Sequence, residues 1–444
     1  MRLFRIALSG CLASAAAFAA PPTFNRDVLP ILQQNCQECH RPGEIAPMSL
    51  LTYQDARPWA KAIKAAVVSQ KMPPWFADPK VGHFANDRRL SAAQIQTLAA
   101  WADNGAPEGE AKDKPAPRKF QTAWNIKPDM VIEMPNAFQL PATGTIDYQY
   151  MLVKGNITED IWVKEAEMRP SNNAVLHHGK VWVRPPGSHW MENATPGVPY
   201  SSGMGRNSVF EGNDIIGKFN PGLGAQTFDI ADPEHGGSAK LIPKGSDFVF
   251  ELHYTATGKP ESDVSRVGLV LAKKAPEMRY YTSPGTPAAT NLVIPPNESN
   301  VEVASESTVG VDGLKLVYIQ PHAHLRGRDF EITVVYPTGE KETVFRGKFD
   351  FNWQLGYDLA KPILLPKGTR IVSVAHYDNS ANNPFNPDPT KRVLWGPQNW
   401  DEMQSVFLGF IMPVHTDVGQ VLNASGPSLL PRPRTGGGPA LASR

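Results

Sequence analysis

Short runs of β-branched and aromatic residues, separated by proline and glycine, fill the chain from Phe120 to about residue 423. The 42 prolines in 444 residues are close to twice the usual share of about 5%, and proline interrupts both helices and central strands. This pattern predicts many short strands rather than a helical bundle. The clearest expected strands are residues 181–183, 248–254, 314–319, 330–336, 371–377 and 406–412.

The segment 273–287 (KKAPEMRYYTSPGTP) divides this region into two halves of comparable length. We therefore expect two all-β sandwiches, at residues 126–280 and 281–423. The charged, proline-rich stretch 106–119 favours a linker. We place this linker at residues 110–125, between the N-terminal segment and the first sandwich. Residues 424–444, with three consecutive glycines and several prolines, are expected to form a disordered tail.

Residues 23–109 have a helical pattern around the sequence Cys36-Gln37-Glu38-Cys39-His40. Apolar residues recur at helical spacing just before this motif, and Ser91-Ala92-Ala93-Gln94 is typical of the start of a second helix. In C-x-x-C-H the two thiols bind the porphyrin and the histidine binds the iron. The order of helix, motif, irregular middle and final helix predicts a small all-α cytochrome c domain with one covalent haem c.

The alternative for the cysteine pair is half of a zinc site, but the chain has no second pair to complete one. For the opposite axial position of the haem, Met72 in the sequence KMPPW is favoured, because Met-Pro-Pro before the final helix resembles the distal-ligand loop of small cytochromes. Met48 is the competing candidate. It lies eight residues after His40, and its other role would be core packing.

The first 19 residues are typical of an export signal, with Arg2 and Arg5, an apolar run and an A-x-A cleavage site. The protein is therefore expected to be periplasmic or secreted, and bacterial in type. A lipoprotein anchor at Cys11 is the alternative. No later segment approaches the ~18 apolar residues of a membrane span.

Charge and cysteine content limit the remaining possibilities. The 44 basic and 43 acidic residues provide no field that would attract nucleic acid, which we do not expect as a partner. If Cys11 leaves with the signal, Cys36 and Cys39 are the remaining cysteines, and the haem uses both. The β domains are then expected to fold without disulfides.

His322 and His324 are the most persuasive pair of metal ligands. On a strand, alternate residues share a face, so both imidazoles would lie on one side with Gln320 and Arg326 while Ile319 points to the core. Two imidazoles on one face can bind one ion. The alternative is an exposed polar face with incidental histidines.

Two further groups of candidates need partners. His253 lies opposite the apolar face of its expected strand. His177 and His178 are adjacent and would point to opposite faces unless a bulge, a twist or the strand end intervenes, which Gly179 could permit. Without such a feature, one of the two histidines belongs to the core and the other to the surface.

Met403, in the sequence WDEM, precedes the apolar run 406–412. Most methionines fill cores. A thioether beside two imidazoles, however, favours Cu(I) over Zn(II), so Met403 is a candidate third ligand to His322 and His324.

Taken together, His177-His178, His253 in ELHY, HAHLRGR at 322–328 and DEM at 401–403 resemble the copper type II, ascorbate-dependent monooxygenases. This is the family of peptidylglycine and dopamine β-hydroxylating enzymes, and the similarity covers about residues 126–423. The resemblance implies two jelly-roll-like sandwiches with one copper each, facing across a solvent-filled cleft. It implies an electron-transfer copper at His177, His178 and His253, and an oxygen-activating copper at His322, His324 and Met403.

The chain also departs from that family. Its disulfides cannot form here, and Gln404 stands where a cysteine follows the copper methionine. Gln320, Ser405 and Phe407 replace the arginine, asparagine and tyrosine of the peptide-amidating branch. Glycine-extended peptides are therefore not expected as substrates. Other residues, among them Arg326, Arg328 and Tyr377, could bind something else, and His376 is a further candidate pocket residue.

The resemblance and the haem motif together predict a monooxygenase that hydroxylates a C–H bond of a small organic substrate with dioxygen. Electrons would come from an upstream donor through the fused haem, in place of ascorbate. The alternative is a non-catalytic periplasmic protein that transfers electrons or binds copper.

Overall fold

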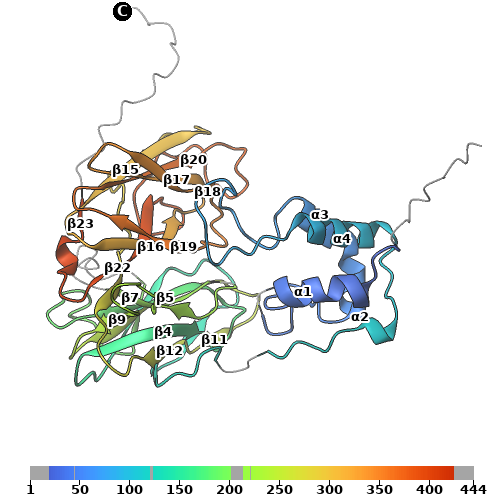
Figure 1. Cartoon of the computed structure of the whole chain (residues 1–444), viewed down its shortest axis with the longest axis horizontal. Coiled ribbons are helices and arrows are strands. Elements are labelled where there is room, and N and C mark those ends of the chain that lie inside the picture. The colour runs from blue at the N-terminus through green and yellow to red at the C-terminus, as the bar shows by residue number, and fades with distance from the viewer. Residues whose placement is uncertain (1–19, 45, 121–123, 202–213, 221, 425–444) are drawn as a thin grey trace, which may run out of the picture. The chain divides into compact units, whose positions relative to one another are not determined.

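The computed structural model describes residues 20–44, 46–120, 124–201, 214–220 and 222–424. The expected export signal and residues 425–444 of the expected tail lie outside these ranges. Contacts group the described residues into a helical unit (residues 20–37, 48–73 and 90–118) and a β-sheet unit (38–47, 74–89 and 119–424). The prediction of an N-terminal helical part followed by β-structure is confirmed (Figure 1).

The helical unit has a core made by apolar faces of short helices. In α4 the Ser91 hydroxyl accepts the N–H of Gln94, whose side chain accepts the N–H of Ser91, which is the expected capping arrangement. Leu98 and Trp101 on this helix are fully buried. The helices are η1 (Phe24–Val28), α1 (Leu29–Asn35), α2 (Tyr53–Ala56), η2 (Arg57–Trp59), α3 (Ala60–Val68), α4 (Ala92–Asp103) and η3 (Ala111–Asp113).

Two features of this unit differ from expectation. The middle segment was expected to be irregular, yet α2 and α3 lie there, and Ala60, Ile63 and Val67 of α3 are buried at helical spacing. The first part of the expected linker is attached to the start of the chain: Gln33 donates to the carbonyl of Ala116 and Arg118 donates to that of Gln33. These hydrogen bonds extend the helical unit to Arg118.

The β-sheet unit is built on one long sheet that runs through both expected sandwiches (Figure 1). In the described residues this sheet has nine strands, and β13 joins its two halves by pairing parallel to β9 and antiparallel to β22. In spatial order the strands are β1 (Met130–Glu133), β12 (Arg266–Leu271), β4 (Ile161–Arg169), β9 (Ser238–Ile242), β13 (Met278–Thr282), β22 (Ser405–Pro413), β16 (Leu314–His322) and β19 (Tyr357–Leu365), with β8 (Gln226–Thr227) beside β4.

Smaller sheets complete the unit. One contains β6 (Pro199–Tyr200), β3 (Gln149–Val153), β10 (Asp247–Tyr254), β5 (Leu176–Arg184) and β7 (Asp214–Phe219). Another contains β18 (Lys341–Lys348), β17 (Gly327–Val335), β20 (Arg370–Tyr377), β15 (Val301–Val309) and β23 (Leu422–Ala424). Two short pairs are β2 (Phe138–Leu140) with β11 (Glu261–Asp263), and β14 (Val293–Ile294) with β21 (Val393–Leu394); η5 is Val418–Gln420.

Two large hydrophobic cores and a smaller one lie in the described part of the β-sheet unit, and β13 contributes to both large cores. Tyr280 packs in the first core and the next residue, Tyr281, in the second. Adjacent strand residues point to opposite faces, so this one strand serves both cores. Near the division expected at residues 280 and 281 the chain passes from one core to the other, but Val317 and Ile411 of the second half pack in the first core and the sheet continues across the division.

Residues 74–89 belong to the β-sheet unit, although the sequence placed them inside the helical domain. Trp75 packs edge-on against Tyr357 of β19 with ring centroids 4.8 Å apart, and Phe84 lies 5.3 Å from the same ring. Both side chains lie in or against the second core. The aromatic residues after Met72-Pro73-Pro74 thus pack in the β-sheet unit.

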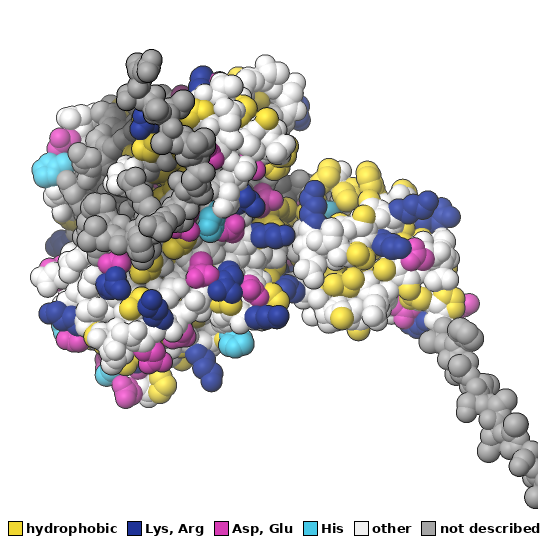
Figure 2. Space-filling view, turned by 90° about the horizontal axis from the view of Figure 1, so that it is seen from above, with side chains coloured by type: hydrophobic (Ala, Val, Ile, Leu, Met, Phe, Trp, Pro, Cys, Tyr) yellow, Lys and Arg dark blue, Asp and Glu magenta, His cyan; other side chains and the backbone are white. Residues whose placement is uncertain are grey.

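The surface of the β-sheet unit carries both signs of charge. On the face seen in Figure 2, basic and acidic side chains are interspersed, as the near-equal totals of each imply. In the described part of the chain, none of the helices has the length and apolar character that crossing a membrane requires.

Candidate functional site

Three of the predicted ligands meet where β5 pairs with β10. His178 lies opposite His253, but the register then shifts so that Tyr254 pairs with Leu176. His177 is the extra residue of this β-bulge, and a bulge redirects the side chain of the inserted residue. One nitrogen from each of His177, His178 and His253 lies within 4.8 Å of the others. The bulge that the sequence required for a shared site is present.

The hydrogen bonds of this histidine triad leave nitrogen atoms facing one another. His177 Nδ1 and His178 Nδ1 are 3.1 Å apart, and His178 Nε2 is 2.8 Å from the hydroxyl of Tyr148. The Asn399 side-chain amide lies 2.9 Å from His253 Nε2. His253 Nδ1 is buried and has no hydrogen-bond partner. A buried, unpartnered imidazole nitrogen beside two others suits a metal ion.

Burial keeps the candidate imidazoles neutral. Burial lowers the pKa of His177, and it lowers the pKa of His178 and of His322 well below the ordinary value. It also lowers the pKa of His253 to about 3 and the pKa of His324 to about 4. Neutral imidazole is the form that binds metal.

The second site begins at the end of β16. His322 is the last residue of the strand and His324 follows two residues later; both are buried, which excludes the alternative of an exposed polar face. His324 Nδ1 lies 3.3 Å from the backbone carbonyl of Asp401, which can only accept, so Nδ1 carries the proton. His322 Nδ1 lies 2.8 Å from Gln354 Oε1. Both rings thus present Nε2 to a ligand, in the way that outer partners orient metal-bound histidines.

A buried carboxylate connects this strand end to the loop that carries Met403. Glu402 accepts the backbone N–H groups of His324, Arg326 and Met403. Burial raises the pKa of Glu402 to about 7, although these three hydrogen bonds act to lower it. The Tyr377 hydroxyl donates to the Met403 carbonyl at 2.7 Å. These bonds determine where Met403 lies relative to the two histidines.

His322, His324 and Met403 line one cavity of about 150 Å³. Residues from both sandwiches form its wall, and aromatic side chains such as Trp182 and Phe407 are prominent among them. The full lining is Tyr148, Tyr150, Lys180, Trp182, Ser201, Glu251, Pro284, Gly285, Ala288, Thr290, His322, His324, Trp395, Pro397, Gln398, Met403, Ser405 and Phe407. A concave, mainly apolar space with a few polar groups is typical of a small-molecule site.

Phe351, in the loop between β18 and β19, packs against both histidine groups. Its ring centroid is 6.2 Å from that of His324, and 5.6, 6.4 and 6.3 Å from those of His177, His178 and His253. The resemblance implied two sites facing across solvent. In this chain an aromatic side chain contacts both.

The haem motif is divided between the two units. Cys36 is the residue at which α1 ends, and it packs against the helical core. Cys39 and His40 belong with the β-sheet unit, and all three side chains are partly exposed. Met48 packs against the helical core, which is its alternative role, whereas Met72 is partly buried in the helical unit.

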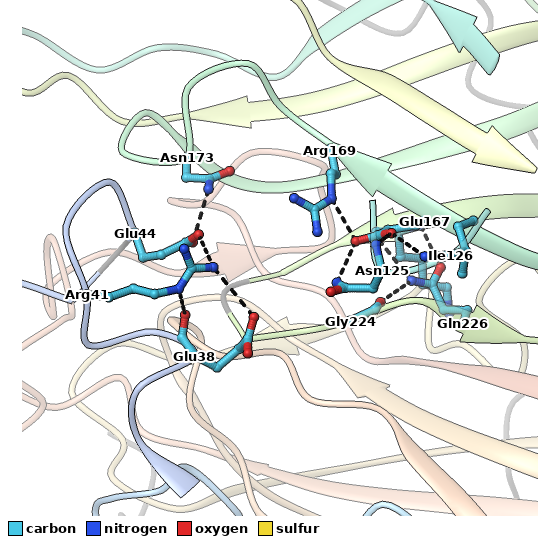
Figure 3. A network of polar contacts seen from close by, with 11 residues as sticks. Glu38, Arg41, Glu44, Asn125, Ile126, Glu167, Arg169, Asn173, Gly224 and Gln226 are labelled. Carbon is cyan, nitrogen blue, oxygen red and sulfur yellow. Dashed lines mark hydrogen bonds and ion pairs between the residues drawn. The ribbon is translucent and has the colours of Figure 1, made fainter. Parts of the chain in front are cut away.

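The segment 38–47 is held on the first sandwich by a polar network (Figure 3). Arg41 forms ion pairs with Glu38 and with Glu44, the second at 2.7 Å. Asn173 donates to Glu44 at 3.0 Å. Asn173 precedes β5 and lies four residues before His177 in the chain. This network attaches the segment that carries Cys39 and His40 to the loop leading into the histidine triad.

Other predicted site residues have structural partners instead. Arg326 is buried and donates to Asn379 at 2.8 Å and to the carbonyl of Trp400 at 3.1 Å, so it supports the Met403 loop, as Tyr377 does. Arg328 donates to the carbonyl of Ser299. His376 lies 2.7 Å from Asp329 and 3.6 Å from Glu302. None of these four residues is among those that line the cavity in the described structure.

Sequence reasoning missed the residues that orient the candidate ligands: Tyr148, Gln354, Asn399, Glu402 and the ring of Phe351. They come from loops or strand ends distant in sequence from the ligands, and no motif marks them. Glu402 is the exception, because it directly precedes the candidate ligand Met403 in the sequence. An acidic residue at that position is a candidate hydrogen-bond partner for the site.

Comparison with known proteins adds little. No protein-family model and no curated protein matches the chain. Among solved structures, the major capsid protein P2 from bacteriophage PM2 is 11% identical over 64% of this chain and 97% of that chain, with a TM-score of 0.30. The structure of the infectious bursal disease virus Gx strain is 11% identical over 68% of this chain and 75% of that chain, with a TM-score of 0.17. The N-terminal CBM22 tandem domain from Paenibacillus barcinonensis Xyn10C is 10% identical over 66% of this chain and 81% of that chain, with a TM-score of 0.12. Scores this low support no argument about this chain.

Proposed function

We propose that this chain is an exported, copper-dependent monooxygenase that hydroxylates a C–H bond of a small organic molecule and receives electrons through a covalently attached haem. The carrying observation is that the six candidate copper ligands fall into two groups, with His322, His324 and Met403 on a substrate-sized cavity. Such a protein resembles the copper type II monooxygenases, with a cytochrome c-like domain added before two jelly-roll-like sandwiches.

The donor sets suit copper. His177, His178 and His253 would hold one ion through three imidazoles, and His322, His324 and Met403 would hold the other through two imidazoles and a thioether. Bound there, copper would supply one-electron redox chemistry and the activation of dioxygen. The overall reaction inserts one oxygen atom into a C–H bond and releases the other as water, using two electrons and two protons.

The chain's own residues prepare this chemistry. Burial keeps the imidazoles unprotonated, Gln354 and Asp401 orient the two rings of the second site, and Glu402 fixes the Met403 loop. The aromatic wall of the cavity limits water near the reacting bond.

Electron entry at the histidine triad is supported by the polar network that attaches residues 38–47 near Asn173. From the triad, a short hydrogen-bonded route leads to the cavity. His253 Nε2 lies 2.9 Å from the side-chain amide of Asn399, which is two residues before Asp401, and the carbonyl of Asp401 accepts from His324. The proposal assigns the haem to Cys36, Cys39 and His40, with Met72 or Met48 as the second axial ligand.

The test is substrate-dependent oxygen consumption by the copper-loaded, reduced protein across a panel of small organic compounds. Met403→Ile should abolish consumption while haem reduction and the triad copper persist, since isoleucine keeps the apolar bulk but lacks the sulfur. Met412→Ile is the matched control, because Met412 is fully buried in the second core. The control should cost under about 1.5 kcal/mol of stability and keep activity.

An active Met403→Ile protein that still binds two coppers would reject the assignment of the second site. The unaltered protein could also bind two coppers that are reduced reversibly and yet consume no oxygen with any compound. That result would favour a non-catalytic protein that transfers electrons or binds copper.

A further inference from the structure

A buried ion pair lies on the wall of the cavity and has no role in the proposed function so far. Lys180 of β5 and Glu251 of β10 are paired at 2.9 Å, and their side chains are 13% and 11% exposed. Both line the cavity that contains His322, His324 and Met403. Burying two charges costs free energy unless their partners are well placed, so the polar partners of each charge decide what the pair can do.

The two members of the pair differ in what they still offer a ligand. Glu251 accepts from Lys180 at one oxygen and from the Trp182 indole N–H at the other, at 2.8 Å. Lys180 has three N–H donors, and in the described part of the chain Glu251 is the acceptor that the structure gives it. Its ammonium lies 4.9 Å from the ring centroid of Phe407 and 5.8 Å from that of Trp182. Within this pair, the hydrogen-bonding capacity left open to a ligand is therefore that of the Lys180 ammonium.

The size and the walls of the cavity limit the ligand. A volume of about 150 Å³ is similar to that of an apolar protein cavity that holds one benzene molecule. Trp182, Trp395 and Phe407 supply aromatic surface, and Pro284 and Ala288 supply aliphatic surface. A single ring or an aliphatic group of similar volume fits such a space.

The charges around the cavity favour an anion. The candidate ligands His322, His324 and Met403 are neutral, so they would leave the positive charge of a metal ion uncompensated. Lys180 adds a further positive charge on the wall of the same cavity. A cationic ligand would meet like charge in a buried site, which is costly.

We propose that the cavity binds a small organic acid of single-ring size, with its carboxylate hydrogen-bonded to Lys180 and its apolar body between aromatic walls beside Met403. That this acid is the substrate rests on the proposed monooxygenase function; the binding itself does not.

Binding is tested on the purified full-length chain by fluorine NMR with three probes of one shape: 4-fluorobenzoate, 4-fluorobenzamide and 4-fluorobenzylamine. Line broadening with increasing protein gives the dissociation constants, both with copper loaded and after copper removal. The benzoate should bind at least about tenfold more tightly than the benzylamine in the copper-loaded protein. Equal binding of the amine, or no binding of any probe, would overturn the proposal.

Lys180→Met tests the assigned residue. It should weaken benzoate binding by at least about tenfold and change benzamide binding by less than about threefold. The matched control is Lys154→Met: Lys154 is also paired to a carboxylate of β10, Asp247 at 2.9 Å, but it is 59% exposed. The control should leave both dissociation constants unchanged. Unchanged benzoate binding in Lys180→Met contradicts the proposal.

Lys180→Met leaves Glu251 without its partner, so circular dichroism is used first to verify that the variant is folded. The double variant Lys180→Met with Glu251→Gln removes both charges and should show the same selective loss of benzoate binding. Oxygen consumption separates the two proposals. If benzoate binding depends on Lys180 but no compound is turned over, the carboxylate site is supported and the monooxygenase function is not. If only cationic compounds are turned over, the carboxylate site is rejected and the monooxygenase function is retained.

Discussion

The histidine triad takes all of its candidate ligands from two paired strands, whereas the second site joins the end of β16 to a loop that is distant in sequence. In the triad, the register of β5 and β10 and one bulge bring the three rings together. In the second site, Glu402 binds the backbone on both sides, at His324 and Arg326 and at Met403. One site lies within a strand ladder. The other lies at the end of the β16–β22 ladder, where a buried carboxylate adds backbone hydrogen bonds.

This difference implies different sensitivities. A bulge within a paired sheet is stabilised by the ladder on either side of it, so the triad should tolerate changes in the second sandwich. The second site lies at the end of the β16–β22 ladder, where His322 pairs with Ser405. Its Met403 loop should shift when the hydrogen bonds of Glu402 are removed. Asn399 and Phe351 contact the triad from the second sandwich, so the separation of the two sites is a testable claim.

The largest expected effect is the loss of one metal site. His253→Ala removes one of three ligands and should reduce the copper content from two ions per chain to one, as measured by elemental analysis after dialysis. His376→Ala is the control, since His376 pairs with carboxylates outside the cavity, and it should keep both ions. Loss of both ions in a folded His253→Ala protein would show that the sites are not independent.

Glu402→Ala should have the next largest effect. Three buried N–H groups would lose their acceptor, and an unsatisfied buried donor costs about 1–3 kcal/mol, so we expect about 3 kcal/mol or more of lost stability in urea unfolding. Copper should be lost from the second site and retained by the triad. Glu331→Ala, which removes an exposed ion pair with Arg346, should cost less than about 1 kcal/mol. A Glu402→Ala protein as stable as the unaltered one would refute the role given to this carboxylate.

A smaller and local effect is expected for Gln354→Leu. It removes the acceptor beside His322 Nδ1 but keeps the Gln354 backbone carbonyl that Asn220 and Gln320 use. Loss of an outer partner lowers metal affinity by roughly 10- to 100-fold. Competition with a Cu(I) chelator should show this loss at the second site, with the triad unchanged; equal weakening of both sites would contradict it.

The smallest effect is expected for Tyr148→Phe. The variant loses the hydrogen bond to His178 and keeps the ring that stacks on His253 at 4.8 Å. We expect a stability change of about 1 kcal/mol and up to about tenfold weaker copper binding at the triad. If only the second site were weakened, the assignment of Tyr148 to the triad would be wrong.

Much of the fold followed from local sequence pattern. The strands at 248–254, 314–319 and 406–412 lie in β10, β16 and β22, and the capping residues Ser91 and Gln94 begin α4. At the expected boundary, Tyr280 and Tyr281 pack in different cores. These features depend on periodicity, capping and turn residues, all of which act over a few residues. Helix α3 has the same kind of local signal, because its buried residues Ala60, Ile63 and Val67 recur at helical spacing.

The continuous sheet and the assignment of residues 74–89 to the β-sheet unit were not predicted. Pairing of β9 with β13 and packing of Trp75 on Tyr357 join residues far apart in the chain. No local pattern encodes which strand edge or which aromatic pocket a segment will meet, because that depends on the surfaces left open by the rest of the fold.

The candidate site divides in the same way. The sequence by itself determined the ligand types and their order, and for His177-His178 it determined that a bulge was needed, because alternate residues on a strand face opposite sides. Only the tertiary structure decided that His253 Nδ1 is buried without a partner, that Glu402 joins His324 to Met403, and that Lys180 lines their cavity. Burial and long-range hydrogen bonding are properties of the packed chain, since each needs atoms that the sequence places tens to hundreds of residues apart.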